Sequence, residues 1–231
     1  MIKDLSIIVL AKNELETLKE LIPKLKKFSK DVLVIDGHSK DQTKLFCKKN
    51  NIQFILDNKL GKGDAQRVGA SKAKNKYIIF IDGDGAHDIK DIKKIYRLLK
   101  KKNDLVICSR QTGGSYDLDL DAGFSSLVRA SGVIFLVILF NKLFKTRFTD
   151  ILYSLKGTTK LLFRKMNTKQ NGFTIEIDIL ICAINNKLKI IEIPSRENAR
   201  KYGVSKLPTI VGLYFIYFII KRSILKKFQN K

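Results

Sequence analysis

Two aspartates separated by one glycine, Asp82 and Asp84, directly follow the apolar run 77–81. The run is rich in β-branched residues and predicts a buried strand. Alternating side chains would then place both carboxylates on one side, just past the strand's end. Open α/β sheets bind their ligands at this carboxyl edge. Paired carboxylates suit Mg²⁺ or Mn²⁺, and either ion can hold a diphosphate. Asp82 and Asp84 are therefore candidate metal ligands, although a plain acidic loop at a strand end would show the same pattern.

The chain around these aspartates alternates between two hydrophobic patterns. Short apolar runs predict strands, and segments with apolar residues at helical spacing predict helices between them. Such alternation indicates an α/β fold with a doubly wound parallel sheet flanked by helices. A nucleotide is the usual ligand of that architecture. Strands are expected at residues 5–10, 31–35, 52–56, 77–81, 104–108 and 189–193.

Polar residues at the ends of the first two expected strands are candidate contacts for such a nucleotide. Asp36 ends the second strand, where a carboxylate can accept hydrogen bonds from a base or a ribose. Ala11, Asn13 and Glu14 end the first strand and would line the same pocket, unless they form an ordinary turn into a helix. Lys62 lies between two glycines at the start of a predicted helix, where it could meet a phosphate or simply face water.

The composition favours a folded protein with an anionic partner. The 231 residues are 45% hydrophobic, enough for a sizeable core, and the formal net charge is +23. So basic a chain suits a phosphorylated substrate, an anionic lipid surface or nucleic acid. The three cysteines, Cys47, Cys108 and Cys182, have neither metal-site spacing nor the pairing of a disulfide framework, which fits a reducing cytoplasm. No signal peptide is predicted, since the first strand pattern begins at Leu5.

Two apolar runs distinguish the second half of the chain, at residues 132–140 and 210–220. Both are shorter than the ~20 residues that span a bilayer. Apolar segments with basic flanks are typical of helices that lie in the interface of an anionic membrane. The alternative is that both segments pack in a core or between two subunits.

Several short motifs, in order along the chain, resemble those of family 2 glycosyltransferases with the GT-A fold. Residues 5–14 are similar to the opening strand and A-x-N-E of that family, and residues 34–43 to its V-D-x-x-S-x-D-x-T. Residues 61–63 match its G-K-G, and residues 82–84 match its D-x-D. Ala86 stands where the family often has a glutamine, so the pattern lacks a third protein ligand for the metal.

The second half resembles the dolichol-phosphate mannose synthase branch of that family. Residues 109–110 match an S-R, residues 149–150 a T-D, residues 172–178 a G-F-x-x-E-x-[ED], and residues 200–207 an R-x-x-G-x-S-K-L. The resemblance implies a metal-dependent, inverting glycosyltransferase with a doubly wound, mostly parallel sheet, to which the apolar runs add C-terminal amphipathic helices. Such an enzyme would move a hexose from a GDP- or UDP-linked sugar to a polyprenyl or dolichyl phosphate. It would be a peripheral protein on the cytoplasmic, inner face of the cell membrane.

The resemblance also implies a division of the chain. Residues 1–207 would form the GT-A domain, in which residues 1–110 bind the nucleotide sugar and residues 111–207 bind the acceptor. Residues 208–231 lie beyond the resemblance, and their apolar run with its basic flank predicts a helix that associates with an anionic membrane.

Breaking a sugar–phosphate bond leaves new negative charge on the nucleoside diphosphate, which the catalyst must neutralise. Asp84, assisted by Asp82, would hold the Mg²⁺ or Mn²⁺ that does so. Arg200, Ser205 and Lys206 belong to a segment that would clamp the same diphosphate. A solvated run of charge is the alternative for these cations.

The acceptor phosphate needs cations more than a base. A phosphate monoester has a second pKa of about 6, so it is largely ionised at neutral pH and can attack without a strong base. Arg110, Arg129 and Ser131 are the candidates to bind it, although Arg129 could instead be a surface residue of an amphipathic helix. Asp150 and Glu176 are candidates for a base or for groups that orient the arginines.

Three other functions are compatible with parts of the sequence. A transferase with a sugar hydroxyl as acceptor would require a carboxylate base. A sugar-nucleotide pyrophosphorylase typically has a glycine-rich loop after its first strand, where this chain has A-K-N-E at residues 11–14. A basic nucleic-acid-binding module is allowed by the net charge. The sequence contains no recognition helix, zinc spacing or RNP-like aromatic motif, so no nucleic-acid partner is expected.

Overall fold

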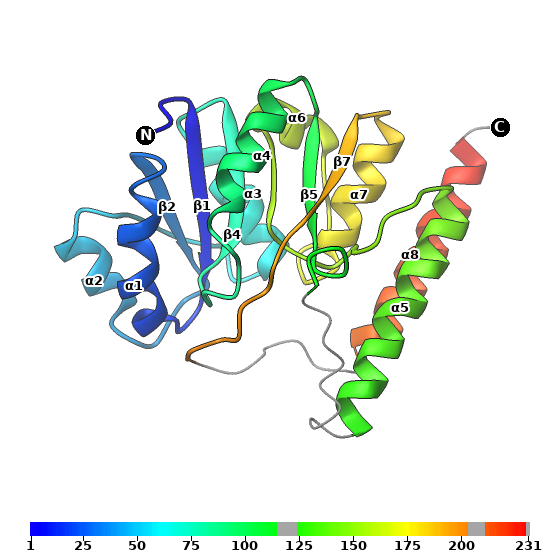
Figure 1. Cartoon of the computed structure of the whole chain (residues 1–231), viewed down its shortest axis with the longest axis horizontal. Helices are drawn as coiled ribbons and strands as arrows, with labels where there is room; N and C mark the ends of the chain where they lie inside the picture. The colour runs from blue at the N-terminus through cyan, green and yellow to red at the C-terminus, as the bar shows by residue number, and fades with distance from the viewer. Residues whose placement is uncertain (115–123, 203–210, 230–231) are drawn as a thin grey trace.

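A seven-stranded sheet forms the centre of the molecule (Figure 1). The computed structural model describes residues 1–114, 124–202 and 211–229. The strand order is β3-β2-β1-β4-β6-β5-β7. The strands are β1 (Leu5–Ala11), β2 (Asp31–Asp36), β3 (Gln53–Leu56), β4 (Tyr77–Asp82), β5 (Leu105–Ser109), β6 (Lys156–Thr159) and β7 (Ile190–Pro194).

The sheet is mostly parallel, as the sequence predicts, with one exception. β1 pairs in parallel with β2 and β4, β2 with β3, and β5 with β7. β6 lies between β4 and β5 and runs antiparallel to both. This strand was not expected, because its sequence Lys-Gly-Thr-Thr has no apolar run. It fits because Gly157 packs directly against the Ile95 side chain, where a Cβ atom would collide.

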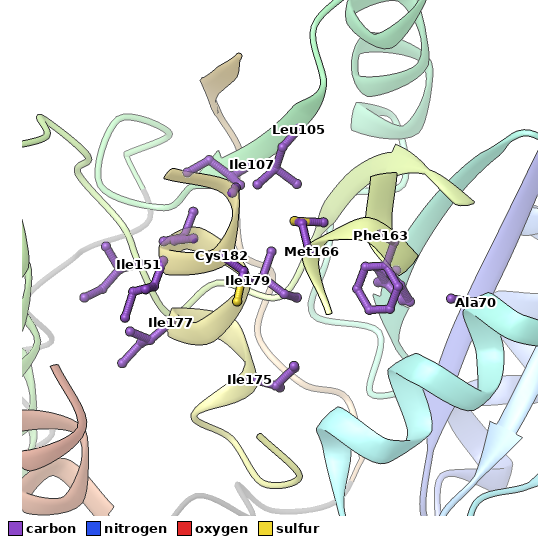
Figure 2. Close-up of a cluster of buried hydrophobic side chains, with 14 of the residues drawn as sticks. Ala70, Leu105, Ile107, Ile151, Phe163, Met166, Ile175, Ile177, Ile179 and Cys182 are labelled. Atoms are coloured by element: carbon purple, nitrogen blue, oxygen red, sulfur yellow. The ribbon is translucent and has the colours of Figure 1, made fainter. Parts of the chain in front are cut away.

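Helices cover both faces of the sheet, which confirms the doubly wound arrangement (Figure 1). Side chains of β1 alternate between two clusters: Ile7 and Val9 lie in one, and Ile8 and Leu10 in the other. Figure 2 shows part of the second cluster, including Phe163 from α6. The helices are α1 (Leu15–Leu25), α2 (Thr43–Lys49), α3 (Lys62–Lys72), α4 (Asp91–Lys100), α5 (Phe124–Phe144), α6 (Lys160–Met166), α7 (Ile175–Asn185) and α8 (Val211–Gln229).

Helices α5 and α8 pack against each other at one end of the molecule, beyond α7 (Figure 1). The apolar run 132–140 lies inside α5, and most of the run 210–220 lies in α8. One side of each helix joins the core, through residues such as Phe140 and Ile219. No helix among the described residues combines the length and the hydropathy needed to cross a bilayer. The domain boundary expected after residue 207 lies outside the described residues.

Candidate functional site

A cavity of about 740 Å³ opens where β1, β2 and β4 end, at the carboxyl edge of the sheet. Two tight backbone contacts shape its floor. The Gly37 N–H donates to the Ala11 carbonyl, and the Gly83 N–H donates to the Leu10 carbonyl, each at 2.8 Å. The structure brings together, in the lining of this cavity, most of the residues that the sequence suggested for the donor: Ala11, Asn13, Glu14, Lys62, Asp82, Asp84 and Arg200.

Asp36 lies just behind the cavity wall rather than in its lining. Its carboxylate is buried and accepts hydrogen bonds from the Ser39 N–H at 2.8 Å and the Ser39 hydroxyl at 2.5 Å. The Ser39 Oγ in turn accepts the Asn13 N–H at 2.7 Å. Asn13 has a φ of 54°, in the left-handed region that few residues other than glycine adopt without support. Asp36 therefore supports the turn that presents Asn13 to the cavity.

The lining residues that were not found from the sequence include His38, Asp57, Lys59 and Phe173. Asp57 directly follows β3, so the strand-end argument applied to Asp36 and Asp82 extends to it. His38 lies in the turn after β2, where its Nε2 is 2.9 Å from the Asp57 carbonyl oxygen. Its φ of 59° could not be inferred from a single sequence.

Asp82 is held in the cavity wall by three neighbouring groups. Its Oδ2 accepts hydrogen bonds from Lys62 Nζ at 2.9 Å and from the Ser154 hydroxyl at 2.6 Å. Its backbone N–H donates to His87 Nδ1 at 3.2 Å. Burial would raise the pKa of Asp82, but the Lys62 charge, then His87 and Ser154, outweigh burial and hold that pKa at about 2. The carboxylate is therefore ionised across the physiological range.

A chain of buried charges continues from Asp82 into the core. Lys62 Nζ also lies 3.2 Å from Glu176, which accepts a further hydrogen bond from Gln66 at 3.0 Å. The second oxygen of Glu176 pairs with Lys156 of β6, and both side chains are almost fully buried. Burial opposes the charge on Lys62, but the two carboxylates overcome it and raise its pKa. Lys62 is thus a fixed cation in the cavity wall.

Asp84 faces a different cation. Its Oδ2 lies 2.8 Å from the Arg200 guanidinium, and its Oδ1 accepts the Ala86 N–H at 3.1 Å. Arg200 belongs to a segment that follows β7 and passes over the D-G-D loop. The Asn198 N–H donates to the Ala86 carbonyl at 2.7 Å, and Lys201 pairs with Glu20 of α1. In this arrangement Arg200 engages one of the two carboxylate oxygens of Asp84.

The pair Asp82 and Asp84 fits a divalent cation. Among the residues that the structure describes, no three His, Cys, Asp or Glu side chains gather into a metal-binding cluster. Mg²⁺ in phosphate sites is nevertheless commonly held by one or two carboxylates together with substrate oxygens and water. Both carboxylates line the cavity, where such oxygens would arrive. The chemistry of this donor set matches the metals expected from the sequence.

Arg110 and Asp150 form a forked ion pair outside the cavity lining. Arg110 Nε and one terminal nitrogen lie 2.7 and 3.2 Å from the two oxygens of Asp150. The other terminal nitrogen lies 3.3 Å from Glu197, and the guanidinium is 5.0 Å from the centre of the Tyr153 ring. Asp150 also accepts the Leu152 N–H at 3.0 Å. These contacts hold the Arg110 side chain in one orientation.

The remaining predicted acceptor and phosphate contacts are only partly described. Ser131 is exposed on α5. Arg129 lies on the same helix, but its side chain is outside the described part of the structure. Ser205 and Lys206 lie in the range 203–210, which is also outside it.

Comparisons with known sequences find glycosyltransferases. The family described as Glycosyl transferase family 2 matches residues 6–169. The glycosyltransferase AglJ of Haloferax volcanii is 26% identical over 193 residues, which cover 83% of this chain and 62% of AglJ. A dolichyl-phosphate beta-glucosyltransferase of Dictyostelium discoideum is 29% identical over 205 residues, which cover 78% of this chain and 63% of that protein. The chain thus spans less than two thirds of the length of these curated relatives.

A solved structure shares the fold. Glucosyl-3-phosphoglycerate synthase from Mycobacterium tuberculosis, crystallised with Mg²⁺ and UDP, matches 95% of this chain with a TM-score of 0.73. The match covers 79% of that chain at 17% sequence identity. A likeness at such low identity concerns the fold alone, and it confirms the GT-A-type sheet expected from the motifs.

Proposed function

This chain belongs to glycosyl transferase family 2, and from that premise we propose that it transfers a hexose from a nucleotide sugar to a polyprenyl phosphate. The proposal is carried by the cavity at the carboxyl edge of the sheet, where Asp82 pairs with Lys62 and Asp84 pairs with Arg200. A nucleoside diphosphate requires room for its base and ribose and compensation for its charge. The cavity offers the room, and its two cations together with a metal ion held by its aspartates would compensate the charge.

The donor half of the reaction depends on charge at the diphosphate. A Mg²⁺ or Mn²⁺ ion held by Asp84 and Asp82 would supply part of that charge when bound. Lys62 supplies a fixed part, because its two carboxylate partners keep it protonated and prevent it from turning away. Arg200 supplies a movable part, since its side chain is one-third exposed and can leave Asp84 for a phosphate oxygen. The nucleotide is UDP or GDP, and the sugar is transferred with inversion.

The acceptor half follows from the chemistry of a phosphate monoester. Such a group is ionised at neutral pH, so the protein must position it rather than deprotonate it. Arg110 is the described residue best suited to this task, because Asp150 and Glu197 fix its orientation. Both oxygens of Asp150 are engaged with Arg110, which favours an orienting role for Asp150 over that of a base. Glu176 similarly serves to position Lys62.

A lipid acceptor requires that the protein work at a membrane surface. The relative from Dictyostelium discoideum is named for a dolichyl phosphate acceptor, and the net charge of +23 suits an anionic surface. We place the protein on the cytoplasmic, inner face of the cell membrane as a peripheral protein.

The test uses purified protein in mild detergent with Mg²⁺ or Mn²⁺, dolichyl phosphate and a panel of radiolabelled UDP- and GDP-sugars. We expect label from one donor to enter the organic phase. The variant Asp84→Asn should abolish transfer, whereas Asp88→Asn, which removes a carboxylate outside the cavity lining, should not. Metal-dependent release of nucleoside diphosphate without lipid labelling would move the acceptor to a sugar hydroxyl. Absence of both transfer and release would refute the proposed function.

A further inference from the structure

Helices α5 and α8 expose an unusual number of large apolar side chains. Most of those exposed among the described residues lie on these two helices, including Ile134, Phe135 and Ile138 on α5 and Tyr217 and Ile220 on α8. Each helix already buries its other side in the core. Folding therefore does not account for the exposed apolar side, and a large exposed apolar patch usually marks a binding surface.

The exposed side chains follow helical spacing. Ile134 and Ile138 are one turn apart on α5, and Tyr217, Ile220 and Ile224 recur every three or four residues on α8. Each helix thus presents an apolar stripe away from the core. The two helices pack against each other (Figure 1), so the stripes belong to one two-helix unit.

The orientation of α8 is fixed from inside. Arg222 reaches inward and lies 3.2 Å from Asp178 of α7, whose side chain is 1% exposed. The other oxygen of Asp178 accepts the Lys169 N–H at 2.9 Å. Rotation of α8 to hide its outer stripe would leave the buried Asp178 carboxylate without its cation, which is costly. The stripe on α8 is therefore held outward.

Basic residues border the apolar stripes. Lys142, Lys145 and Arg147 are exposed at the C-terminal end of α5 and just after it. Lys221 lies beside the outer stripe of α8, with its Nζ 5.6 Å from the centre of the Tyr217 ring. Apolar stripes bordered by lysine and interfacial tyrosine are what an anionic bilayer surface accommodates.

We propose that α5 and α8 together form a membrane-docking surface, whose apolar stripes enter the headgroup region of an anionic bilayer. A second copy of the chain fits this surface less well, because two chains of net charge +23 repel each other. The inference rests on the proposed function for its purpose, since a polyprenyl phosphate acceptor resides in a membrane. Its test is independent, because lipid binding can be measured without any nucleotide sugar.

The experiment is vesicle flotation of the full chain. One set of vesicles contains phosphatidylcholine alone, and the other contains phosphatidylcholine with phosphatidylglycerol. The double variant Ile138→Ser/Tyr217→Ser removes side chains that are 60% and 55% exposed. The matched control Leu45→Ser/Leu161→Ser removes side chains that are 62% and 67% exposed on α2 and α6. Neither pair changes the net charge, and circular dichroism verifies that both fold.

We expect the wild type and the control to float with the anionic vesicles. The α5–α8 variant should bind these vesicles at least about tenfold more weakly. Equal flotation of wild type and variant would overturn the proposal, as would a wild type that floats with neither kind of vesicle. Sedimentation equilibrium without lipid should give a monomer. A dimer that only the α5–α8 variant dissociates would assign the surface to a second copy instead. Lipid binding that depends on this surface, in a protein without transferase activity, would refute the proposed function while leaving this inference intact.

Discussion

Replacing Arg200 by alanine should affect the binding of metal and of nucleotide in opposite directions. Around the D-G-D loop the carboxylates of Asp82, Asp84 and Glu176 are matched in number by the cations of Lys62, Lys156 and Arg200, and Arg200 pairs with Asp84. A divalent cation must therefore compete with Arg200 for Asp84. Once the cation is bound, the released guanidinium is available to the diphosphate. The Arg200 side chain therefore opposes the binding of the metal ion and favours the binding of the nucleoside diphosphate.

The expected change in metal affinity follows from the solvent exposure of the Arg200–Asp84 ion pair. The Arg200 side chain is 33% exposed and that of Asp84 10%, so their ion pair contributes only about 1 kcal/mol. Its loss should tighten the binding of Mn²⁺ alone about fivefold. A hydrogen bond to a charged group contributes about 1.5–3 kcal/mol, so the nucleoside diphosphate should bind about 10- to 150-fold more weakly in the presence of metal.

Electron paramagnetic resonance of free Mn²⁺ measures the first constant without nucleotide, and calorimetry with UDP or GDP measures the second. Lys201→Ala is the matched control, because it removes the adjacent cation, which pairs with Glu20 instead of Asp84. That variant should leave the Mn²⁺ constant unchanged. If Arg200→Ala bound Mn²⁺ no more tightly than the wild type, Arg200 would not compete for Asp84, and the reasoning would be wrong.

Three further predictions concern stability and reactivity. Lys156→Met should lower the free energy of unfolding, measured by urea titration, by about 3–5 kcal/mol, because it leaves the buried Glu176 carboxylate without its main partner. The double variant with Glu176→Gln should recover part of that loss. Gly63→Ala should destabilise the protein by about 1–3 kcal/mol, because the added Cβ would collide with a backbone carbonyl. The control Gly132→Ala places its Cβ in open space and should not destabilise the protein, and thermal unfolding of the two variants tests the difference. Burial, followed by the charge of a nearby carboxylate, raises the pKa of Cys47 to about 11, so its thiol should resist Ellman's reagent at pH 8 and react as the pH rises towards 11 or the chain unfolds.

Much of the sheet could be predicted because its strands are apolar runs. Residues 77–81 show the general case, since a parallel strand buried on both faces needs hydrophobic residues throughout. β6 could not be predicted for the opposite reason. Its Lys156 is stable in the core only because Glu176, 20 residues later, lies opposite it. A pattern of single residues contains no information about such a partner.

The candidate site likewise contains residues that the sequence predicts and residues that it does not. Asp82, Asp84 and the residues after β1 were found because strand ends gather at one edge of a parallel sheet. Extension of that argument to β3 would have found Asp57. The pairing of Asp84 with Arg200 joins residues more than 100 positions apart, so it required the structure. The role of Asp36 behind the wall, rather than in it, likewise depends on a hydrogen-bonded turn that spacing does not reveal.

The ion pair between Arg222 and Asp178 has a consequence for how the chain can be shortened. Deletion of an apolar terminal helix is a common route to a more soluble fragment. In this chain, a fragment that ends before α8 would leave Asp178 without its cation and would uncover the core residues that Phe218 and Ile219 of α8 cover. The fragment would expose new apolar surface in place of the surface removed. Among the described residues, α8 carries more exposed large apolar side chains than any other helix, and yet the rest of the fold requires this helix for its own solubility.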